Sequence, residues 1–239
     1  MIEPKIIYED NHIIVVIKPH NISVQEDSSQ DEDMLTIIKN FIKERDNKPG
    51  NVFLGLVHRL DRPTGGVMVF AKTSKAAARL AEQMKNGDFD KTYLAVVCGK
   101  PREQKGKIIS YLKKDERTNT AMIVPQSTTG AKRAELDYEM LEYDSKTNHA
   151  LVKVKLYSGR GHQIRVQLKS IKCPIFGDQK YGGDDMPKVM LHLFAAELCF
   201  LHPTSKQKMI FRVYPPENED AWSEFNLEKF LSLKTNVDD

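Results

Sequence analysis

The sequence predicts an α+β fold built on a mixed, mainly antiparallel sheet. Two amphipathic helical patterns lie within the first ninety residues, whereas strand patterns predominate from Lys91 onward. Helices and strands therefore do not alternate regularly, as they would in a doubly wound parallel sheet. The 239 residues contain no Pro/Gly/Ser-rich linker and no visible internal repeat, so we expect one domain over 1–239.

The first ninety residues predict a hairpin, a polar loop and two helices. Two apolar runs, Ile6–Tyr8 and Ile13–Ile17, flank an Asp-Asn turn and are typical of paired strands. The polar stretch 25–33 predicts a mobile loop. Apolar residues then recur at helical spacing in two places. They are Leu35, Ile38, Phe41 and Ile42 in the first helix, and Ala77, Leu80, Ala81 and Met84 in the second.

The remainder of the chain predicts strands and a C-terminal helix. Alternating and β-branched patterns indicate strands over most of this part. They cover residues 93–97, 107–111, 121–124, 131–142, 149–157, 191–201 and 209–214. After Pro216 the chain is acidic, and we expect a helix over 222–233 followed by a frayed tail.

A nonapeptide between two apolar runs has the composition of an active-site loop. In HRLDRPTGG (58–66), Asp61 stands between Arg59 and Arg62, whose charges would keep its carboxylate ionised, as a nucleophile requires. The two glycines allow positive φ or a close backbone approach. A structural aspartate that braces a turn through backbone amides is the alternative, and this segment alone favours neither.

Three further segments favour the active-site interpretation. KTYLAVVCG (91–99) predicts a strand with a tyrosine near its start, and GRGHQIR (159–165) predicts a glycine-rich entry to a short helix. PIFGDQKYGG (174–183) is a glycine-bounded polar loop. Together with the nonapeptide, these segments resemble in sequence and order the motifs of the RluA-type pseudouridine synthases, which isomerise uridines in ribosomal and transfer RNA. The resemblance implies the pseudouridine synthase fold, with a catalytic cleft and flanking helices.

The resemblance covers nearly the whole chain and departs from the family pattern at three positions. Gly65 replaces a serine, Gly161 a threonine and Gln167 a histidine. The opening of the catalytic domain falls within the first ten residues, so we expect no S4-type RNA-binding module.

The resemblance also implies roles for three residues. Asp61 would be the nucleophile, either at the sugar or by removing a ribose proton to give a glycal. Arg165 would pair with Asp61, because a guanidinium binds a carboxylate through two hydrogen bonds that lysine does not reproduce. Tyr93 would lie against the uracil ring, since a phenol is a weak base near neutral pH unless it is tuned.

A uridine inside folded RNA has to be extruded before it can react. The resemblance implies that Arg59 stacks where the base had been. The other candidate RNA-binding residues, which would line the cleft or contact phosphates, are His58, Arg62, Arg160 and His162. A solvated surface arginine is the alternative for Arg62.

Composition permits this function without indicating it. The net charge is only +3, and RNA binding depends on a local basic patch more than on the sum. The three cysteines form no CxxC pair and the histidines lack helical ligand spacing, so we expect no metal and no cofactor. The sequence shows no signal peptide and no apolar run long enough to span a membrane, so we expect a cytoplasmic protein. Its oligomeric state is open, with a monomer as the default expectation.

Two points stay open at this stage. The resemblance implies a structured RNA substrate, for which we rank 23S ribosomal RNA ahead of tRNA. Two rival functions are a non-catalytic RNA-binding protein of the same fold, which intact Asp61, Tyr93 and Arg165 disfavour, and a metal-dependent hydrolase built on His58 and Asp61, which the missing ligand cluster disfavours.

Overall fold

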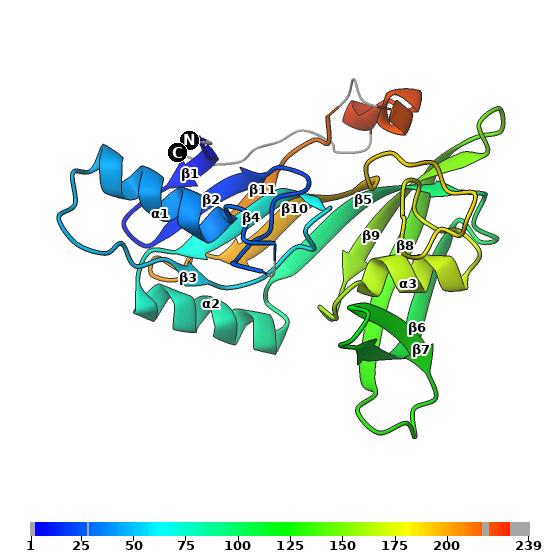
Figure 1. Cartoon of the computed structure of the whole chain (residues 1–239), viewed down its shortest axis with the longest axis horizontal. Coiled ribbons are helices and arrows are strands. Elements are labelled where there is room, and N and C mark those ends of the chain that lie inside the picture. Colours follow the sequence, from blue (N-terminus) through cyan, green and yellow to red (C-terminus); the bar gives the residue numbers. More distant parts are fainter. Residues whose placement is uncertain (1–2, 28, 217–219, 230–239) are drawn as a thin grey trace. The chain divides into compact units, whose positions relative to one another are not determined.

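The structure is a computed structural model that describes residues 3–27, 29–216 and 220–229, and the chain divides into two compact units. The first unit contains 3–90 and 195–213, and the second contains 91–194 and 214–229. Strands outnumber helices in Figure 1, and every strand pair whose register is described is antiparallel. The expected α+β class is confirmed.

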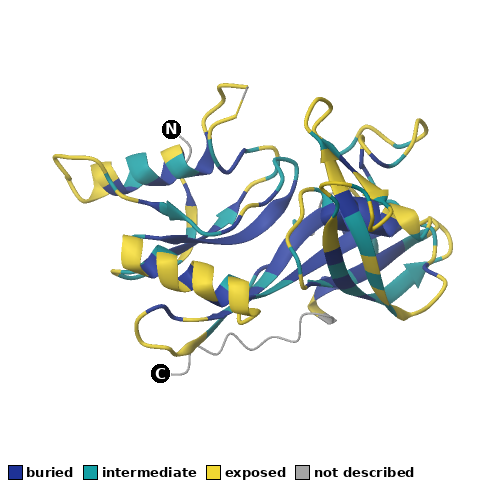
Figure 2. Cartoon of the chain, turned by 90° about the horizontal axis from the view of Figure 1, so that it is seen from below, coloured by how far each residue is buried: buried dark blue, intermediate teal, exposed yellow. Residues whose placement is uncertain are grey.

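The first unit is an antiparallel sheet between two helices. Its strands are ordered β1-β2-β4-β10, with β11 paired to β10 and β3 paired to β4. All seven residues of β4 are buried and β2 is nearly as enclosed, because α1 and α2 lie on opposite sides of these strands (Figure 2). The bounds are β1 Lys5–Glu9, β2 Ile13–Lys18, α1 Met34–Arg45, β3 Gly55–Leu56, β4 Gly65–Ala71, α2 Ser74–Asn86, β10 Leu193–Leu201 and β11 Lys208–Arg212.

The expected hairpin and both expected helices are present. β1 pairs with β2, and the Asp10 carboxylate accepts the backbone N–H groups of His12 and Ile13 in the turn between them. Each helix begins at a side-chain cap, since Asp33 accepts the N–H of Thr36 and Thr73 that of Ala76. Local capping and apolar periodicity agree here, which is why the sequence predicts these elements correctly.

Gly66 fixes the point at which the HRLDRPTGG loop enters β4. Its φ is +127°, and a Cβ atom at this position would lie 2.3 Å from the carbonyl oxygen of Ala195. No side chain fits against that backbone, so glycine is required for the close approach of the two segments.

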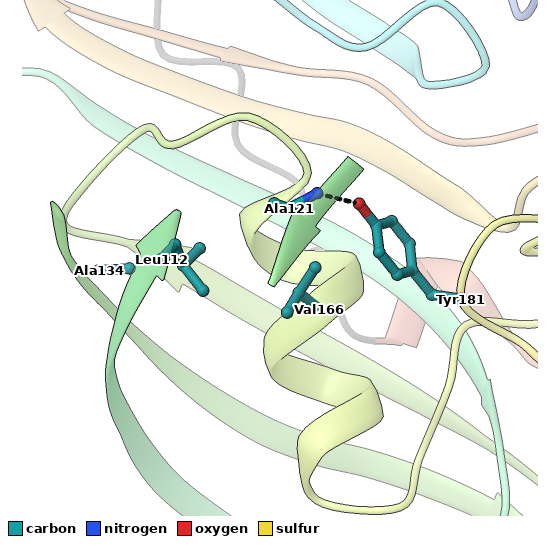
Figure 3. Close-up of a cluster of buried hydrophobic side chains, with 5 residues drawn as sticks. All are labelled: Leu112, Ala121, Ala134, Val166 and Tyr181. Atoms are coloured by element: carbon teal, nitrogen blue, oxygen red, sulfur yellow. Dashed lines mark hydrogen bonds between the residues drawn. The ribbon is translucent and has the colours of Figure 1, made fainter. Parts of the chain in front are cut away.

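The second unit is an antiparallel sheet with a helix on one face. Its strands are ordered β5-β9-β8-β6-β7. Val166 of α3 packs in a buried cluster with Leu112, Ala121, Ala134 and Tyr181 (Figure 3). We call the sheet face that α3 covers the inner face, and the opposite one the outer face. The bounds are β5 Asp90–Cys98, β6 Lys105–Asp115, β7 Thr120–Val124, β8 Lys132–Asp144, β9 His149–Leu156 and α3 Gln163–Ser170.

The expected C-terminal helix over 222–233 is not formed in its described part. Residues 220–229 contain two short 3₁₀ helices, η1 (Asp220–Glu224) and η2 (Leu227–Lys229), while 230–233 lie outside the described residues. Trp222 and Phe225 are both buried, and their spacing of three residues puts them on one side of a 3₁₀ turn. Burial of these rings therefore takes precedence over the helical propensity of the segment.

Candidate active site

The HRLDRPTGG loop lies in the first unit, between β3 and β4. The N–H of Thr64 donates to the carbonyl of Asp61 at 2.9 Å, which closes a tight turn, and Asp61 is half-buried. Arg59 is exposed, as a side chain that reaches into RNA requires. The loop thus presents a carboxylate on a closed turn with an exposed guanidinium two residues before it.

His58 is buried rather than available to RNA. Only 6% of it is exposed, its Nε2 accepts the N–H of Val69 at 3.2 Å, and its ring lies 5.5 Å from that of Phe89. An enclosed imidazole that bonds the backbone of β4 favours a structural role over the RNA contact expected from the sequence.

Lys18, at the end of β2, is hydrogen-bonded to the HRLDRPTGG loop through its side chain. Its Nζ donates to the carbonyl oxygens of Pro19 at 2.8 Å, Ile22 at 2.6 Å and Arg62 at 3.0 Å, and its side chain is fully buried. Nδ1 of His20 donates to the next carbonyl, that of Pro63, at 2.8 Å. Two successive carbonyls that follow Asp61 are therefore held by the last residue of β2 and by His20 just after it.

Burial strongly affects the acidity of Lys18. Desolvation lowers the pKa of Lys18 to about 7, and Arg62 lowers it as well, whereas the neighbouring Asp61 carboxylate raises it. The electrostatic effect of Asp61 on Lys18 indicates that the two side chains are near one another. Three carbonyl acceptors match the three N–H bonds of an ammonium, which favours the charged form against the desolvation cost.

The pH dependence of stability tests this environment of Lys18. The folded-state pKa of about 7 lies below the ordinary value of 10.5, so between these values the unfolded state binds more protons and the free energy of unfolding rises with pH. In Lys18→Met this contribution is lost. We expect the unfolding free energy of the native chain minus that of the variant to rise from pH 7 to pH 9, by at most about 1.4 kcal/mol per pH unit.

Urea unfolding at pH 6, 7, 8 and 9 measures this difference. The exposed Lys75 of α2 provides the control, because Lys75→Met should give a difference that does not change with pH. A flat difference for Lys18→Met as well would show that Lys18 titrates normally.

Arg62 pairs with an acidic loop of its own unit. Its guanidinium forms ion pairs with Asp27 and Asp31, and donates to Ser29 Oγ at 2.7 Å and to the carbonyl of Asn21 at 3.1 Å. Asp31 and Ser29 belong to the stretch that the sequence predicts as a mobile loop. RNA contact by Arg62 therefore requires competition with these carboxylates.

In the second unit, the start of α3 is organised by Tyr181. His162 precedes the helix with φ of 56°, and its Nδ1 lies 2.7 Å from the Tyr181 hydroxyl, which also accepts the N–H of Ala121 at 2.7 Å. The Tyr181 ring lies 5.0 Å from the guanidinium carbon of Arg165. Tyr181 thus orients two of the residues expected from the sequence.

Arg165 forms a buried ion pair with Asp178. Its Nε and Nη2 donate to the two carboxylate oxygens at 2.8 and 2.5 Å, and the side chains are 5% and 0% exposed. Asp178 Oδ1 also accepts the N–H groups of Lys180 and Tyr181. The guanidinium is therefore rigidly oriented within its unit, and the bidentate geometry expected of Arg165 is made with Asp178.

Tyr93 and Arg160 complete the expected set in this unit. Tyr93 is 6% exposed on β5 and pairs with Val154 of β9, which places it on the inner face with α3. Arg160 is exposed, and its Nε donates to the carbonyl of Arg133 at 3.1 Å. Gln167, where the family pattern has a histidine, is buried and donates to Ile108, Ser110 and Ala134.

The structure brings the expected residues together within two groups. Asp61 and Arg62 lie with Lys18 in the first unit, whereas Tyr93 and Arg165 lie in the second. Their joint action in one site is part of the function proposed below. The sequence reasoning missed Lys18, Asp178 and Tyr181 as supporting residues, although the last two stand in the quoted GDQKYG segment.

The described part of the chain contains neither a metal-ligand cluster nor a helix that could span a membrane. Over 3–27, 29–216 and 220–229, no three histidine, cysteine or carboxylate side chains gather as a ligand set for a metal ion. Within the same ranges, no helix combines the length and the apolar character that crossing a bilayer demands.

Comparisons with known proteins assign the family. A family model described as RNA pseudouridylate synthase matches residues 12–170. An uncharacterized RNA pseudouridine synthase of Aquifex aeolicus is 34% identical over 89% of this chain and 69% of its own length. The ribosomal large subunit pseudouridine synthase C of Haemophilus influenzae is 33% identical over 88% and 65%.

A solved structure supports the fold. Human RNA pseudouridylate synthase domain containing 4 superposes with a TM-score of 0.73 at 23% identity, covering 89% of this chain and 88% of that one. The chain spans about two thirds of the length of the curated relatives it matches. From its sequence and fold, this chain belongs to the RNA pseudouridylate synthase family, whose enzymes isomerise uridine to pseudouridine in RNA.

Proposed function

We propose that this chain isomerises specific uridines in structured RNA, with Asp61 as the reacting carboxylate. The observation that supports this most directly is the bracing of the Asp61 turn, whose two following carbonyls are held by Lys18 and His20. A carboxylate on a rigid turn is pre-organised for attack, because its geometry does not have to be ordered at the moment of reaction.

The reaction needs no cofactor by its own chemistry. The bond from uracil N1 to ribose C1′ breaks, the base turns, and a bond from C5 to C1′ forms. The proton leaves C5 and N1 gains one, so no electrons are exchanged. Asp61 either attacks C1′ or removes a ribose proton, and both routes begin with the ionised carboxylate.

Arg165 and Tyr93 would act on this carboxylate and on the base. Asp178 accepts two of the five N–H groups of the Arg165 guanidinium, and we assign a further N–H of this side chain to Asp61. Tyr93 lies on the same face of its sheet as α3, where its ring would stack against the turned uracil. The four residues then form one site in which Asp178 orients Arg165.

Access to the base requires its extrusion from the RNA. We assign the vacated space to Arg59, because its exposed planar guanidinium can stack between neighbouring bases. Arg160 and His162 would contact phosphates near the start of α3. Arg62 would also contact a phosphate, which would replace its ion pairs with Asp27 and Asp31. The buried side chain of His58 would stabilise the loop through its hydrogen bond with the backbone of Val69.

Large-subunit ribosomal RNA is the proposed substrate, and tRNA is the alternative. The Haemophilus influenzae relative is named for the ribosomal large subunit, which favours the first. We further propose that the chain acts as a monomer and without a metal.

Pseudouridine mapping of total RNA tests the activity and the substrate together. Cells that lack the protein are compared with cells rescued by the native chain or by Asp61→Ala. We expect one or more uridines in large-subunit rRNA to lose the mark and to regain it only with the native chain. A site in tRNA would select the alternative substrate, and unchanged marks together with RNA binding in vitro would favour the non-catalytic function.

A further inference from the structure

The outer face of the second unit carries a regular ladder of charges. Strand register places Glu139 of β8 between Lys105 of β6 and Lys153 of β9, and Asp137 between Lys107 and Lys155. Each of these carboxylates therefore has a lysine on either side. Glu135 in the next row pairs with both Lys107 and Arg133, so the five cations and three carboxylates of the ladder leave two positive charges in excess. Successive rows are two residues apart, about 7 Å along the strand.

A tyrosine within cation–π distance of two of these lysines continues the ladder. Tyr157 follows β9, its side chain is 51% exposed, and its hydroxyl donates to Asp137 at 2.8 Å. The ammonium groups of Lys107 and Lys155 lie 5.2 and 5.6 Å from the ring centroid. This arrangement fixes an exposed aromatic ring beside two cations.

Exposed apolar side chains gather on the same strands. Seven large apolar or aromatic side chains of the described residues are prominently exposed, and three of them lie on the outer face: Ile109 of β6, Met122 of β7 and Tyr157 after β9. Ile109 and Met122 face outward, since they alternate with Leu112 and Ala121 of the inner cluster. A combination of surplus cations, a fixed aromatic ring and apolar neighbours is typical of surfaces that bind single-stranded nucleic acid.

This face is distinct from the one that carries Tyr93 and Arg165. Those residues lie on the inner face with α3, whereas the ladder lies on the other side of the same sheet. Arg160 connects α3 to the start of β8, because it precedes the helix and its Nε donates to the carbonyl of Arg133. Its motif begins two residues after Tyr157.

We propose that the outer face of the second unit is a second RNA-binding surface, on which a base stacks on Tyr157 and the flanking phosphates contact Lys107 and Lys155. The proposal rests on the proposed function insofar as the RNA is the substrate. It extends that function by assigning a flanking single-stranded segment to a surface away from the reacting uridine.

RNA binding at several salt concentrations tests the surface without requiring catalysis. The probes are a 20-nucleotide polyuridylate and inorganic polyphosphate of similar charge, which has no bases. Lys107→Gln with Lys155→Gln should reduce the slope of log affinity against log salt by about 1.4, at roughly 0.7 per single-strand phosphate contact. Tyr157→Ala should weaken polyuridylate binding by about 5- to 150-fold, the cost of one stacked base, and leave polyphosphate binding unchanged.

Matched variants separate recognition from general effects of charge or folding. Lys75→Gln with Lys85→Gln removes the same charge from exposed positions of α2 in the first unit and should leave the slope near that of the native chain. Tyr157→Phe keeps the ring but not its hydroxyl and should bind polyuridylate nearly as the native chain does. Thermal unfolding of each variant checks that it is folded.

The outcomes distinguish this inference from the proposed function. Loss of polyuridylate binding in the outer-face variants supports the second surface even if no uridine is ever modified. If these variants kept the polyuridylate affinity and the salt slope of the native chain, the second RNA-binding surface would be overturned, whether or not the chain modifies RNA. The exposed face would then be a candidate surface for a protein partner. Equal weakening by the α2 control would also overturn it, because the effect would then follow net charge alone.

Discussion

Asp61→Asn is expected to lower the single-turnover rate of uridine isomerisation by about 10³-fold or more. The amide keeps the size of the side chain but is neither a nucleophile nor a base, so both proposed routes lose their first step. The braced turn around Asp61 involves backbone groups that the substitution leaves in place. RNA affinity should therefore change much less than rate.

The measurement is quench-flow formation of pseudouridine in the RNA that mapping identifies, with the dissociation constant determined in parallel. Asp88→Asn is the control, since Asp88 is an exposed carboxylate just after α2 and should retain the native rate. A rate within tenfold of native for Asp61→Asn would exclude this carboxylate as the reacting group. A parallel loss of affinity and rate would assign it to binding instead.

Asp178→Asn is expected to lower the free energy of unfolding by about 3–5 kcal/mol. The substitution leaves the Arg165 guanidinium, which is 5% exposed, without its buried counter-charge. It also replaces the acceptor of the N–H groups of Lys180 and Tyr181. Because Arg165 would lose its fixed orientation, the isomerisation rate of the folded variant should fall as well.

Urea unfolding of a double-mutant cycle tests the pair. Arg165→Met with Asp178→Asn should cost less than the sum of the two single substitutions, since neither charge is then left unpaired. Glu116→Gln breaks an exposed pair with Lys114 and should cost less than about 1 kcal/mol. Additive losses in the cycle would show that the two side chains do not stabilise one another.

Elements with a strong periodic pattern were predictable from the sequence. The continuous apolar runs of β2 and β4, the helical spacing in α1 and α2, and the glycine-rich entry to α3 each match the structure. In these segments local propensity and the final packing agree. The sequence also predicts that the glycines of this loop allow a positive φ or a close backbone approach. Only the structure identifies Ala195 as the backbone that Gly66 approaches.

Supporting residues that act across long sequence separations were not predictable. Lys18 bonds the carbonyl of Arg62, 44 residues later, and no local pattern indicates which loop a lysine after a strand will reach. His58 is polar and adjacent to Arg59, so its burial against Phe89 depends on tertiary packing. The C-terminal segment likewise has a helical pattern, and its 3₁₀ form is set by buried rings.

The discontinuity of the first unit sets an order of events during synthesis. Gly66 closes against Ala195, and residues 195–213, which complete this unit, follow the whole of 91–194 in the chain. At ordinary elongation rates the ribosome delivers Ala195 roughly ten seconds after Gly66. The loop that carries Asp61 therefore stays incomplete until β10 is synthesised, and a nascent chain that stops before β10 contains Asp61 but not the strand against which its loop closes.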